Sequence, residues 1–261
     1  MQVHAYPPLR FGTLVKRYKR FFADIELETG ELITAHCANT GPMTGICKIG
    51  SRVGVSCSDN PKRKLPYSWE IIHIDNVWVG VHTGLPNQVV GKMLNDRIIP
   101  ELGAYDLVRA EVAYGSENSR IDFVLSTTDP KTDKTSKTFI EIKNTTWCDG
   151  SLALFPDTVT TRGQKHLREL ISIKDANTRS ILLYFINRGD CDRFAPGDRA
   201  DPEYGKLLRE AIAEGVEILP CRFDVTPNGI EYLGLAELVL PDFRNTIIPP
   251  MTKVQEFHAN A

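Results

Sequence analysis

The most constraining feature of this sequence is a pair of apolar segments that carry charged residues at alternate positions. Residues 119–123 contain Asp122, and residues 139–144 contain Glu141 and Lys143. Successive side chains of a strand point to opposite faces, so Glu141 and Lys143 share one face. If the two strands are neighbours, Asp122 joins them, and two carboxylates and one ammonium group converge. Carboxylates hold Mg²⁺ or Mn²⁺ and lysine meets phosphate, so the pattern indicates metal-dependent phosphodiester cleavage.

An acidic residue two positions before a lysine also occurs by chance, and a solvent-exposed strand face is the alternative interpretation. The order of the surrounding segments favours a site. Residues 109–114 form a preceding strand, a helix over 160–177 begins at Thr160 or Thr161 as N-cap, and a buried strand follows over 180–186. This order resembles the core of the PD-(D/E)xK nuclease fold, with Ile121 in place of the namesake proline.

The composition is that of a globular chain without membrane segments. Of 261 residues, 42% are hydrophobic and 25% charged, which excludes global disorder. The N-terminus lacks the apolar core of a signal peptide, and no apolar run is long enough to span a bilayer. Six cysteines include no C-x-x-C pair, which is typical of reduced thiols. We therefore expect a cytoplasmic protein with no membrane partner.

The chain divides near residue 83. Before it, short strands alternate with turns, and the OB-fold is the small barrel that suits them best. The predicted strands cover residues 14–18, 22–28, 32–37, 53–57, 69–74 and 77–81. After it, a mixed pattern predicts an α/β domain with helices over 85–99, 160–177 and 201–214 and an exposed loop over 126–137. We predict a barrel domain over 1–83, an α/β domain with a mixed central sheet over 84–238, and a C-terminal arm over 239–261.

The net charge of −2 does not indicate a nucleic-acid partner, but the distribution of charge does. Basic and aromatic residues gather in the first third of the chain. Basic side chains meet phosphates and aromatic rings stack on bases. The alternative is an exposed basic edge beside core aromatics. The candidate nucleic-acid-binding residues are Arg17, Lys19, Arg20, Lys62, Arg63, Lys64, Tyr67 and Trp69.

Several longer strings together resemble the sugar fermentation stimulation protein (SfsA) family over about residues 10 to 235. The chain departs from the usual family pattern at Ala38, Pro42 and Thr145. None of these is a proposed metal ligand. The matching strings are RYKRF at 17–21, HCANTGPM at 36–43, SDNPKRKL at 58–65, YG at 114–115, NSRIDF at 118–123, EIKN at 141–144, FPD at 155–157 and TRGQKHL at 161–167.

The resemblance implies an OB-like domain followed by a PD-(D/E)xK nuclease-like domain, with DNA as the partner. The family is named for an effect on sugar utilisation, including maltose metabolism, which implies a regulatory role. Many nucleases of this fold are dimers, so a homodimer stays open, although the sequence shows no self-complementary interface.

The expected mechanism is hydrolysis of a DNA phosphodiester bond with Mg²⁺ or Mn²⁺. Asp122 and Glu141 would ligate the ion, with the carbonyl of Ile142 as third protein ligand. Lys143 would orient the attacking water or neutralise the charge that develops on the phosphorane.

Further residues have expected roles around this centre. Glu111 would reach the metal directly or through water, and Gln164 would position the nucleophile or contact the substrate. His166 is predicted to be a surface residue, and Asp157 either lines the site or belongs to a turn. The alternatives are a DNA-binding regulator that retains the fold without turnover, and an interaction protein whose barrel binds peptides.

Overall fold

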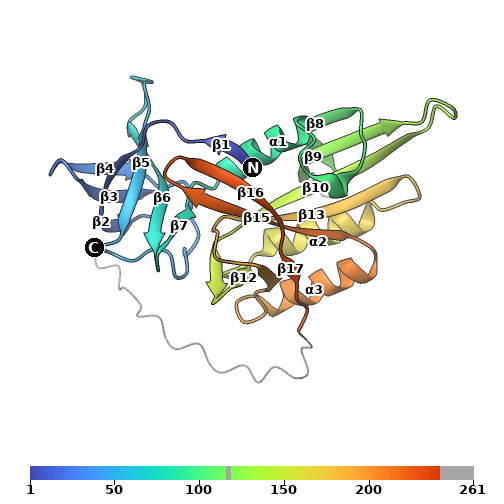
Figure 1. The fold of residues 1–261 in the computed structure, drawn as a ribbon. Coiled ribbons are helices and arrows are strands. Elements are labelled where there is room, and N and C mark those ends of the chain that lie inside the picture. The colour runs from blue at the N-terminus through green and yellow to red at the C-terminus, as the bar shows by residue number, and fades with distance from the viewer. Residues whose placement is uncertain (116–118, 242–261) are drawn as a thin grey trace.

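The computed structural model of the protein describes residues 1–115 and 119–241, which form two sheet-based units (Figure 1). Asn118 and nearly all of the predicted C-terminal arm lie outside the described residues. The first unit is a small barrel. Its strands are β2 (Arg10–Tyr18), β3 (Phe22–Leu27), β4 (Leu32–His36), β5 (Arg52–Cys57), β6 (Tyr67–Ile74) and β7 (Val77–Gly80).

The barrel closes because β4 pairs with β6 as well as with β3. The strand order is β4-β3-β2-β5-β6-β7, and the additional parallel pairing aligns Ala35 with Tyr67. Closure leaves the five strands β2 to β6 without an open edge between β4 and β6, and β7 pairs with β6 beside them. Alternation sends Ala23, Ile25 and Leu27 of β3 into the barrel core. The predicted OB-like barrel is therefore confirmed.

The second unit is built on a mixed seven-stranded sheet in the order β1-β16-β15-β13-β10-β9-β8. β10 pairs with β9 in the antiparallel sense and with β13 in the parallel sense, so the sheet changes direction at β10. This confirms the predicted mixed sheet. The strands are β1 (Gln2–Ala5), β8 (Leu107–Tyr114), β9 (Ser119–Thr128), β10 (Thr135–Thr145), β13 (Thr178–Ile186), β15 (Glu217–Thr226) and β16 (Gly229–Leu235).

Helices cover both faces of this sheet. Val89 of α1 shares one core with Ile140 and Ile142 of β10, whereas α2 and α3 pack on the opposite face. Because the two isoleucines face α1, alternation turns Glu141 and Lys143 toward α2. The helices are α1 (Leu85–Asn95), the 3-10 helix η1 (Pro100–Leu102), α2 (Thr161–Ser172) and α3 (Pro202–Ala213).

Two helix N-caps are as predicted. The Thr160 side chain accepts a hydrogen bond from the backbone N–H of Gly163 at the start of α2. The Asp201 side chain does the same for the N–H of Tyr204 at the start of α3. Such caps satisfy amide groups that have no intrahelical partner.

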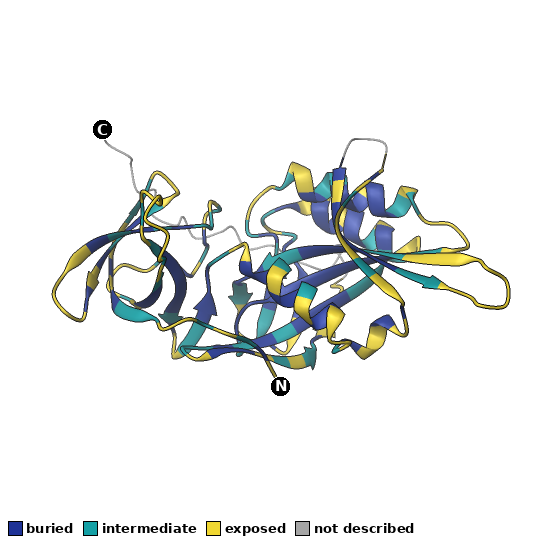
Figure 2. Ribbon diagram, turned by 90° about the horizontal axis from the view of Figure 1, so that it is seen from above, coloured by how far each residue is buried: buried dark blue, intermediate teal, exposed yellow. Residues whose placement is uncertain are grey.

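The predicted loop over residues 126–137 is wrong in extent. β9 continues to Thr128 and β10 starts at Thr135, so only the tip between them is a turn. The strands are polar on both sides because this hairpin projects from the domain, and Figure 2 shows its tip as exposed while the middle of the sheet is buried. Cross-strand hydrogen bonding rather than an apolar face extends the strands here.

The domain boundaries remain predictions, but the first residues depart from them. β1 pairs with β16 and so belongs to the large sheet rather than to the barrel. A separate four-stranded sheet, in the order β11-β12-β14-β17, lies beside α3. Its strands are β11 (Trp147–Asp149), β12 (Leu152–Phe155), β14 (Arg193–Pro196) and β17 (Glu237–Leu238). None of the helices in the described ranges is long and apolar enough to cross a membrane.

Candidate active site

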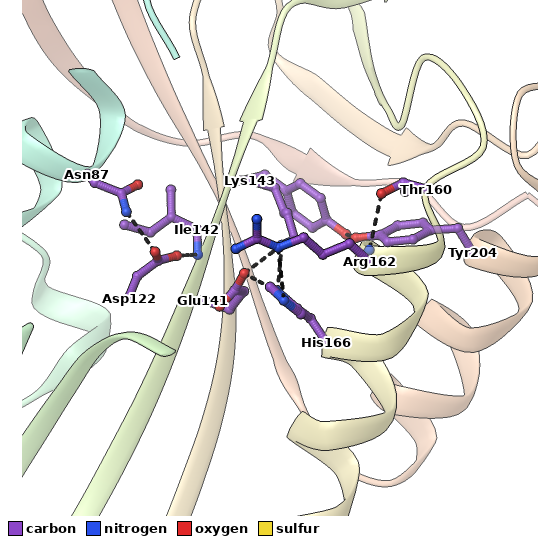
Figure 3. A network of polar contacts seen from close by, with 11 residues as sticks. Asn87, Asp122, Glu141, Ile142, Lys143, Thr160, Arg162, His166 and Tyr204 are labelled. Carbon is purple, nitrogen blue, oxygen red and sulfur yellow. Dashed lines mark hydrogen bonds and ion pairs between the residues drawn. The ribbon is translucent and has the colours of Figure 1, made fainter. Parts of the chain in front are cut away.

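Asp122 lies where two neighbouring strands separate. The antiparallel pairing of β9 with β10 ends at Phe123 and Ile140. Beyond that pair, Asp122 Oδ2 accepts a hydrogen bond of 2.7 Å from the backbone N–H of Ile142. Its Oδ1 accepts one of 2.6 Å from the side-chain amide of Asn87 on α1, as Figure 3 shows. These two bonds hold the carboxylate in one orientation in the gap between the strands.

Glu141, Lys143 and His166 form a charged cluster between β10 and α2 (Figure 3). Lys143 Nζ lies 2.6 Å from Glu141 Oε1 and 3.0 Å from His166 Nδ1, which itself contacts Glu141 Oε1. The side chains of Glu141 and His166 are each 4% exposed, and that of Lys143 is 12% exposed. Charges at this depth destabilise a fold unless they are paired. The pairing therefore explains how the sheet tolerates them.

One oxygen of this cluster has no partner. Glu141 Oε2 is buried and makes no hydrogen bond to any group in the described part of the chain. Buried carboxylate oxygens are rarely left unpaired in native proteins. This atom therefore marks a position where a cation or a water molecule would be stabilised.

The two carboxylates differ in their tendency to hold a proton. Burial raises the pKa of Asp122 to about 6, and the neighbouring Glu141 carboxylate adds to the rise. Burial alone would also raise the pKa of Glu141, but Lys143 and His166 together hold it below its usual range. Neighbouring acids with pKa values pushed apart are typical of functional sites.

A cavity of about 380 Å³ opens beside Asp122 and His166. Arg120 of β9 and Arg162 and Lys165 of α2 line its walls. Positive side chains next to buried carboxylates suit an anionic ligand that is held together with a cation.

Glu111 lines the same cavity and has a strained backbone. It lies one position beyond the β8–β9 pair of Ala110 and Phe123, so its place in the strand is opposite Asp122. Its φ of 53° is left-handed, which costs about 1–2 kcal/mol for a residue with a side chain. Such strain clusters at functional sites. The structure thus brings exposed Glu111 to the site.

Gln164 is placed differently from the prediction. Its amide donates hydrogen bonds of 3.0 and 3.1 Å to the two carboxylate oxygens of Asp201. Asp201 caps α3, so this contact joins α2 to α3. For Gln164 to contact the substrate or position the nucleophile, its amide would have to break these hydrogen bonds to Asp201.

The prediction that His166 is a surface residue is wrong. It lies one helical turn before Leu170 and beside Leu167, both of which are fully buried, so helical geometry sends it to the same core. Its sequence neighbours Lys165 and Arg168 face outward more than it does. The sequence signal for burial was therefore the period of α2 rather than the residue type.

The metal site remains a prediction. Within residues 1–115 and 119–241, no group of three or more His, Cys, Asp or Glu side chains is arranged to hold a metal ion. Asp122 and Glu141 form a pair only, so further ligands would be backbone carbonyls or water. The carbonyl of Ile142 is the predicted one, and its N–H already meets Asp122.

Several predicted nucleic-acid-binding residues are exposed on the barrel. Lys19 and Arg20 form the β2–β3 turn, both with positive φ, next to Phe21, which is 49% exposed. The second exposed group precedes β6 and comprises Lys62, Arg63 and Lys64. The turn therefore presents a cationic and aromatic tip to solvent.

Three of the predicted barrel residues have structural contacts instead. Trp69 is fully buried and its indole N–H donates to the carbonyl of Ile71, so the prediction that it stacks on a base is wrong. The Arg17 guanidinium is half-buried and holds the loop after β4. The half-buried Tyr67 hydroxyl accepts a hydrogen bond from Arg10. All three side chains are therefore engaged with other parts of the protein rather than free in solvent.

Sequence reasoning missed three residues of the site, which are Asn87, Arg120 and Arg162. Asn87 lies in a helix predicted from its apolar positions, and no local pattern distinguishes it from other polar helix residues. Arg162 Nε approaches His166 Nε2 at 3.4 Å and lines the cavity. Its position four residues before His166 places the two on one helix face, which is the signal that could have identified it.

Comparison with known families decides which group of proteins this chain resembles. The SfsA N-terminal OB domain matches residues 15–81, and the sugar fermentation stimulation protein RE domain matches residues 84–229. The chain belongs to the sugar fermentation stimulation protein family. Two SfsA family members, each named sugar fermentation stimulation protein homolog, come from Cyanothece sp. and Microcystis aeruginosa.

These SfsA relatives are similar over almost their whole length. The Cyanothece protein is 61% identical over 241 residues, which cover 91% of this chain and 98% of the relative. The Microcystis protein is 62% identical over 240 residues, with the same shares. A solved structure of Pyrococcus furiosus SfsA in complex with Ca²⁺ is 23% identical and superposes with a TM-score of 0.81 over 92% of this chain and 99% of that one. The two-unit architecture is therefore that of SfsA.

Proposed function

We propose that this SfsA family protein binds DNA and hydrolyses its phosphodiester bonds with Mg²⁺ or Mn²⁺ at Asp122 and Glu141. The observation that carries the proposal is the position of Asp122 in the gap between β9 and β10. Beside it, the second oxygen of Glu141 is buried and has no partner within residues 1–115 and 119–241. Oriented carboxylates are the donors that these hard cations take.

The residues present fit a divalent cation. A positive charge would relieve both the raised pKa of Asp122 and the unpaired oxygen of Glu141. Asp122 and Glu141 would hold the ion with the Ile142 carbonyl, and waters would complete the shell. When bound, such an ion polarises a phosphoryl oxygen and supplies hydroxide from its bound water. Ca²⁺, present with Pyrococcus furiosus SfsA, also takes oxygen ligands and belongs in the test.

The protein's own cations would act on the phosphate. The Lys143 ammonium, held by Glu141 and His166, would stabilise the negative charge that develops on the phosphorane. Arg120 and Arg162 line the cavity and would bind the non-bridging oxygens, for which a guanidinium is well shaped. His166 would act as a positioning residue, because it contacts both members of the Glu141–Lys143 pair.

The barrel would supply most of the DNA affinity. Lys19 and Arg20 at the β2–β3 turn would meet phosphates, and the exposed ring of Phe21 would stack on a base. The exposed run of Lys62, Arg63 and Lys64 would add phosphate contacts. Binding of this kind weakens steeply as salt is added. The logarithm of the binding constant falls with the logarithm of the salt concentration, with a slope of about 0.7 to 0.9 for each phosphate contact.

A non-catalytic DNA-binding regulator is the second candidate function. It is favoured by the finding that Glu141 Oε1 is already paired with Lys143 and in contact with His166 without a metal. The name of the relatives refers to stimulation of sugar fermentation, which suits a regulator.

The test is cleavage of labelled single-stranded, duplex and branched DNA with Mg²⁺, Mn²⁺, Ca²⁺ or EDTA. We expect products with Mg²⁺ or Mn²⁺, and a loss of about 100-fold or more in Asp122→Ala and Lys143→Ala. Asp149→Ala and Lys206→Ala are matched controls, because both side chains are exposed and lie outside the cavity. Both controls should retain full activity.

Each outcome assigns the function. DNA binding by gel shift without cleavage of any substrate would replace the nuclease proposal with the regulator. Equal loss of activity in the control variants would show that the products do not arise at Asp122 and Lys143. Failure to bind DNA at low salt would overturn both candidates.

A further inference from the structure

A second cavity lies at the junction of the two units, outside the candidate active site. It has a volume of about 170 Å³ and is lined on the barrel side by Asn39 and Thr83. The end of β10 contributes Asn144 and Thr145. We propose that this cavity is a subsite for one nucleobase of the bound DNA, an inference that rests on the proposed DNA binding.

The barrel wall of the cavity is held in place by specific contacts. The Arg17 guanidinium donates hydrogen bonds of 2.9 Å to the carbonyls of both Asn39 and Gly41. The backbone N–H of Thr44 donates across the junction to Asp157 Oδ2 at 3.2 Å. The cavity is therefore preformed, which reduces the entropic cost of ligand binding. This also explains why Arg17 is turned inward.

One wall contains a buried polar group that has no hydrogen-bond partner among the described residues. Thr145 is 1% exposed, and its hydroxyl has no hydrogen-bond partner in the described part of the chain. Asn144, next to it, is oriented by a bond of 3.1 Å from Asn187 to its amide oxygen. A buried hydroxyl without a partner is unfavourable, so a ligand with hydrogen-bonding edges would be stabilised here.

The size and walls suit a single heterocycle. Drug-sized ligands need about 300–1,000 Å³, and 170 Å³ corresponds to about six waters at about 30 Å³ each. The aromatic residues Trp147 and Phe155 line the cavity and offer apolar surface to a flat ring. A nucleobase combines such a ring with hydrogen-bonding edges.

The charge of the cavity favours a base over a phosphate group. Its lining, as far as the chain is described, contains no Lys or Arg, and Asp157 is its one charged residue. A carboxylate repels phosphate but accepts hydrogen bonds from the amino groups of adenine, cytosine and guanine. Thymine has no amino group, so we expect it to bind most weakly.

The cavity is also near enough to the candidate active site to receive a base of the same strand. Thr145 follows Lys143 by two positions on β10, or about 7 Å at about 3.4 Å per residue. Phosphates of one DNA strand are about 3.4 Å apart along a duplex axis. A base one or two nucleotides from a phosphate at Lys143 would therefore lie beside the cavity.

The test uses one oligonucleotide sequence in which each position in turn lacks its base. Affinity for the full-length protein is measured by fluorescence anisotropy in EDTA, so that no strand is cut. We expect one position at which loss of the base weakens binding about tenfold. A thymine at that position should weaken binding less than loss of the base does.

Variants connect that position to the cavity. The double variant Asp157→Asn, Thr145→Val keeps side-chain size and an acceptor for Thr44, and it should reduce the tenfold penalty severalfold. Asp149→Asn is the matched control, since this exposed residue lies outside the cavity, and it should keep the full penalty. A penalty that is unchanged in the double variant would assign the base contact elsewhere and overturn the proposal.

The remaining outcomes separate this subsite from DNA binding itself. If the oligonucleotide binds normally and loss of the base has the same effect on affinity at every position, the subsite is overturned and DNA binding stands. No binding of any oligonucleotide would overturn both. Quenching of Trp147 fluorescence by monosaccharides but not by nucleosides, scored against Trp147→Phe, would reassign the cavity to a sugar.

Discussion

The barrel and the mixed sheet place their charges in opposite ways. In the barrel, the Arg52–Glu28 ion pair is more than half exposed on both sides, and Lys19, Arg20 and residues 62–64 occupy exposed turns and loops. In the mixed sheet, Glu141 and Lys143 are enclosed between β10 and α2. Exposed pairs contribute about 0–1 kcal/mol, whereas breaking a buried pair costs about 3–5 kcal/mol. The comparison therefore sets an exposed ion pair, which adds little to stability, against an enclosed one that is costly to break.

The largest expected effect contrasts one acid from each region. Glu141→Ala should lower the free energy of unfolding by about 3–5 kcal/mol, because it leaves Lys143 without its partner. Glu28→Ala should lower it by less than about 1 kcal/mol. Urea unfolding at pH 7 with EDTA measures both. Equal losses would contradict the distinction between the two regions.

The next effect concerns the exposed aromatic tip of the barrel. Phe21→Ala should weaken binding of single-stranded DNA by about 1–3 kcal/mol through loss of stacking, with stability unchanged within about 0.5 kcal/mol. Leu32→Ala is the matched control, since Leu32 is 66% exposed but is not aromatic. Filter binding at two salt concentrations measures the affinities. If both variants lose affinity equally, stacking at the tip is not the cause.

A smaller effect tests the buried acid by pH. Because the pKa of Asp122 is raised to about 6, the carboxylate gains a proton as the pH falls below 6. Metal ligands must be deprotonated, so Mn²⁺ affinity should fall about tenfold between pH 7 and pH 5 and be level above pH 7. Calorimetric titration of the metal-free protein measures it. An affinity that is constant down to pH 5 would place the ion elsewhere.

The last prediction concerns the effect of the Asp122 carboxyl on the stability of the folded protein. The folded-state pKa of Asp122 exceeds its ordinary value of 3.8, so the folded protein is favoured when this group is protonated, and the advantage is lost as the pH rises through 6. Asp122→Asn should therefore stabilise the metal-free protein by up to about 3 kcal/mol at pH 8. At pH 4 the variant and the wild type should unfold alike, and a difference that persists there would contradict this explanation.

Much of the fold could be predicted from local patterns. All six predicted barrel strands are present, with end points that differ by at most four residues, as in β2, which begins at Arg10. Alternation placed Glu141 and Lys143 on one face, and the caps of α2 and α3 are at Thr160 and Asp201. β1 was missed because it is short and pairs with β16 at the other end of the chain. β11 was missed because its three residues are too few to show a period.

The sequence by itself determined which residues could form each strand, helix and cap and which of them share a face. Strand alternation, helix period and capping depend only on neighbours within a few positions. Only the tertiary structure decided which of them meet. Asp122 is oriented by Asn87, 35 positions earlier, and Asp157 meets Thr44 across 113 positions. Such contacts depend on how separate segments pack against one another, and no local pattern encodes that packing.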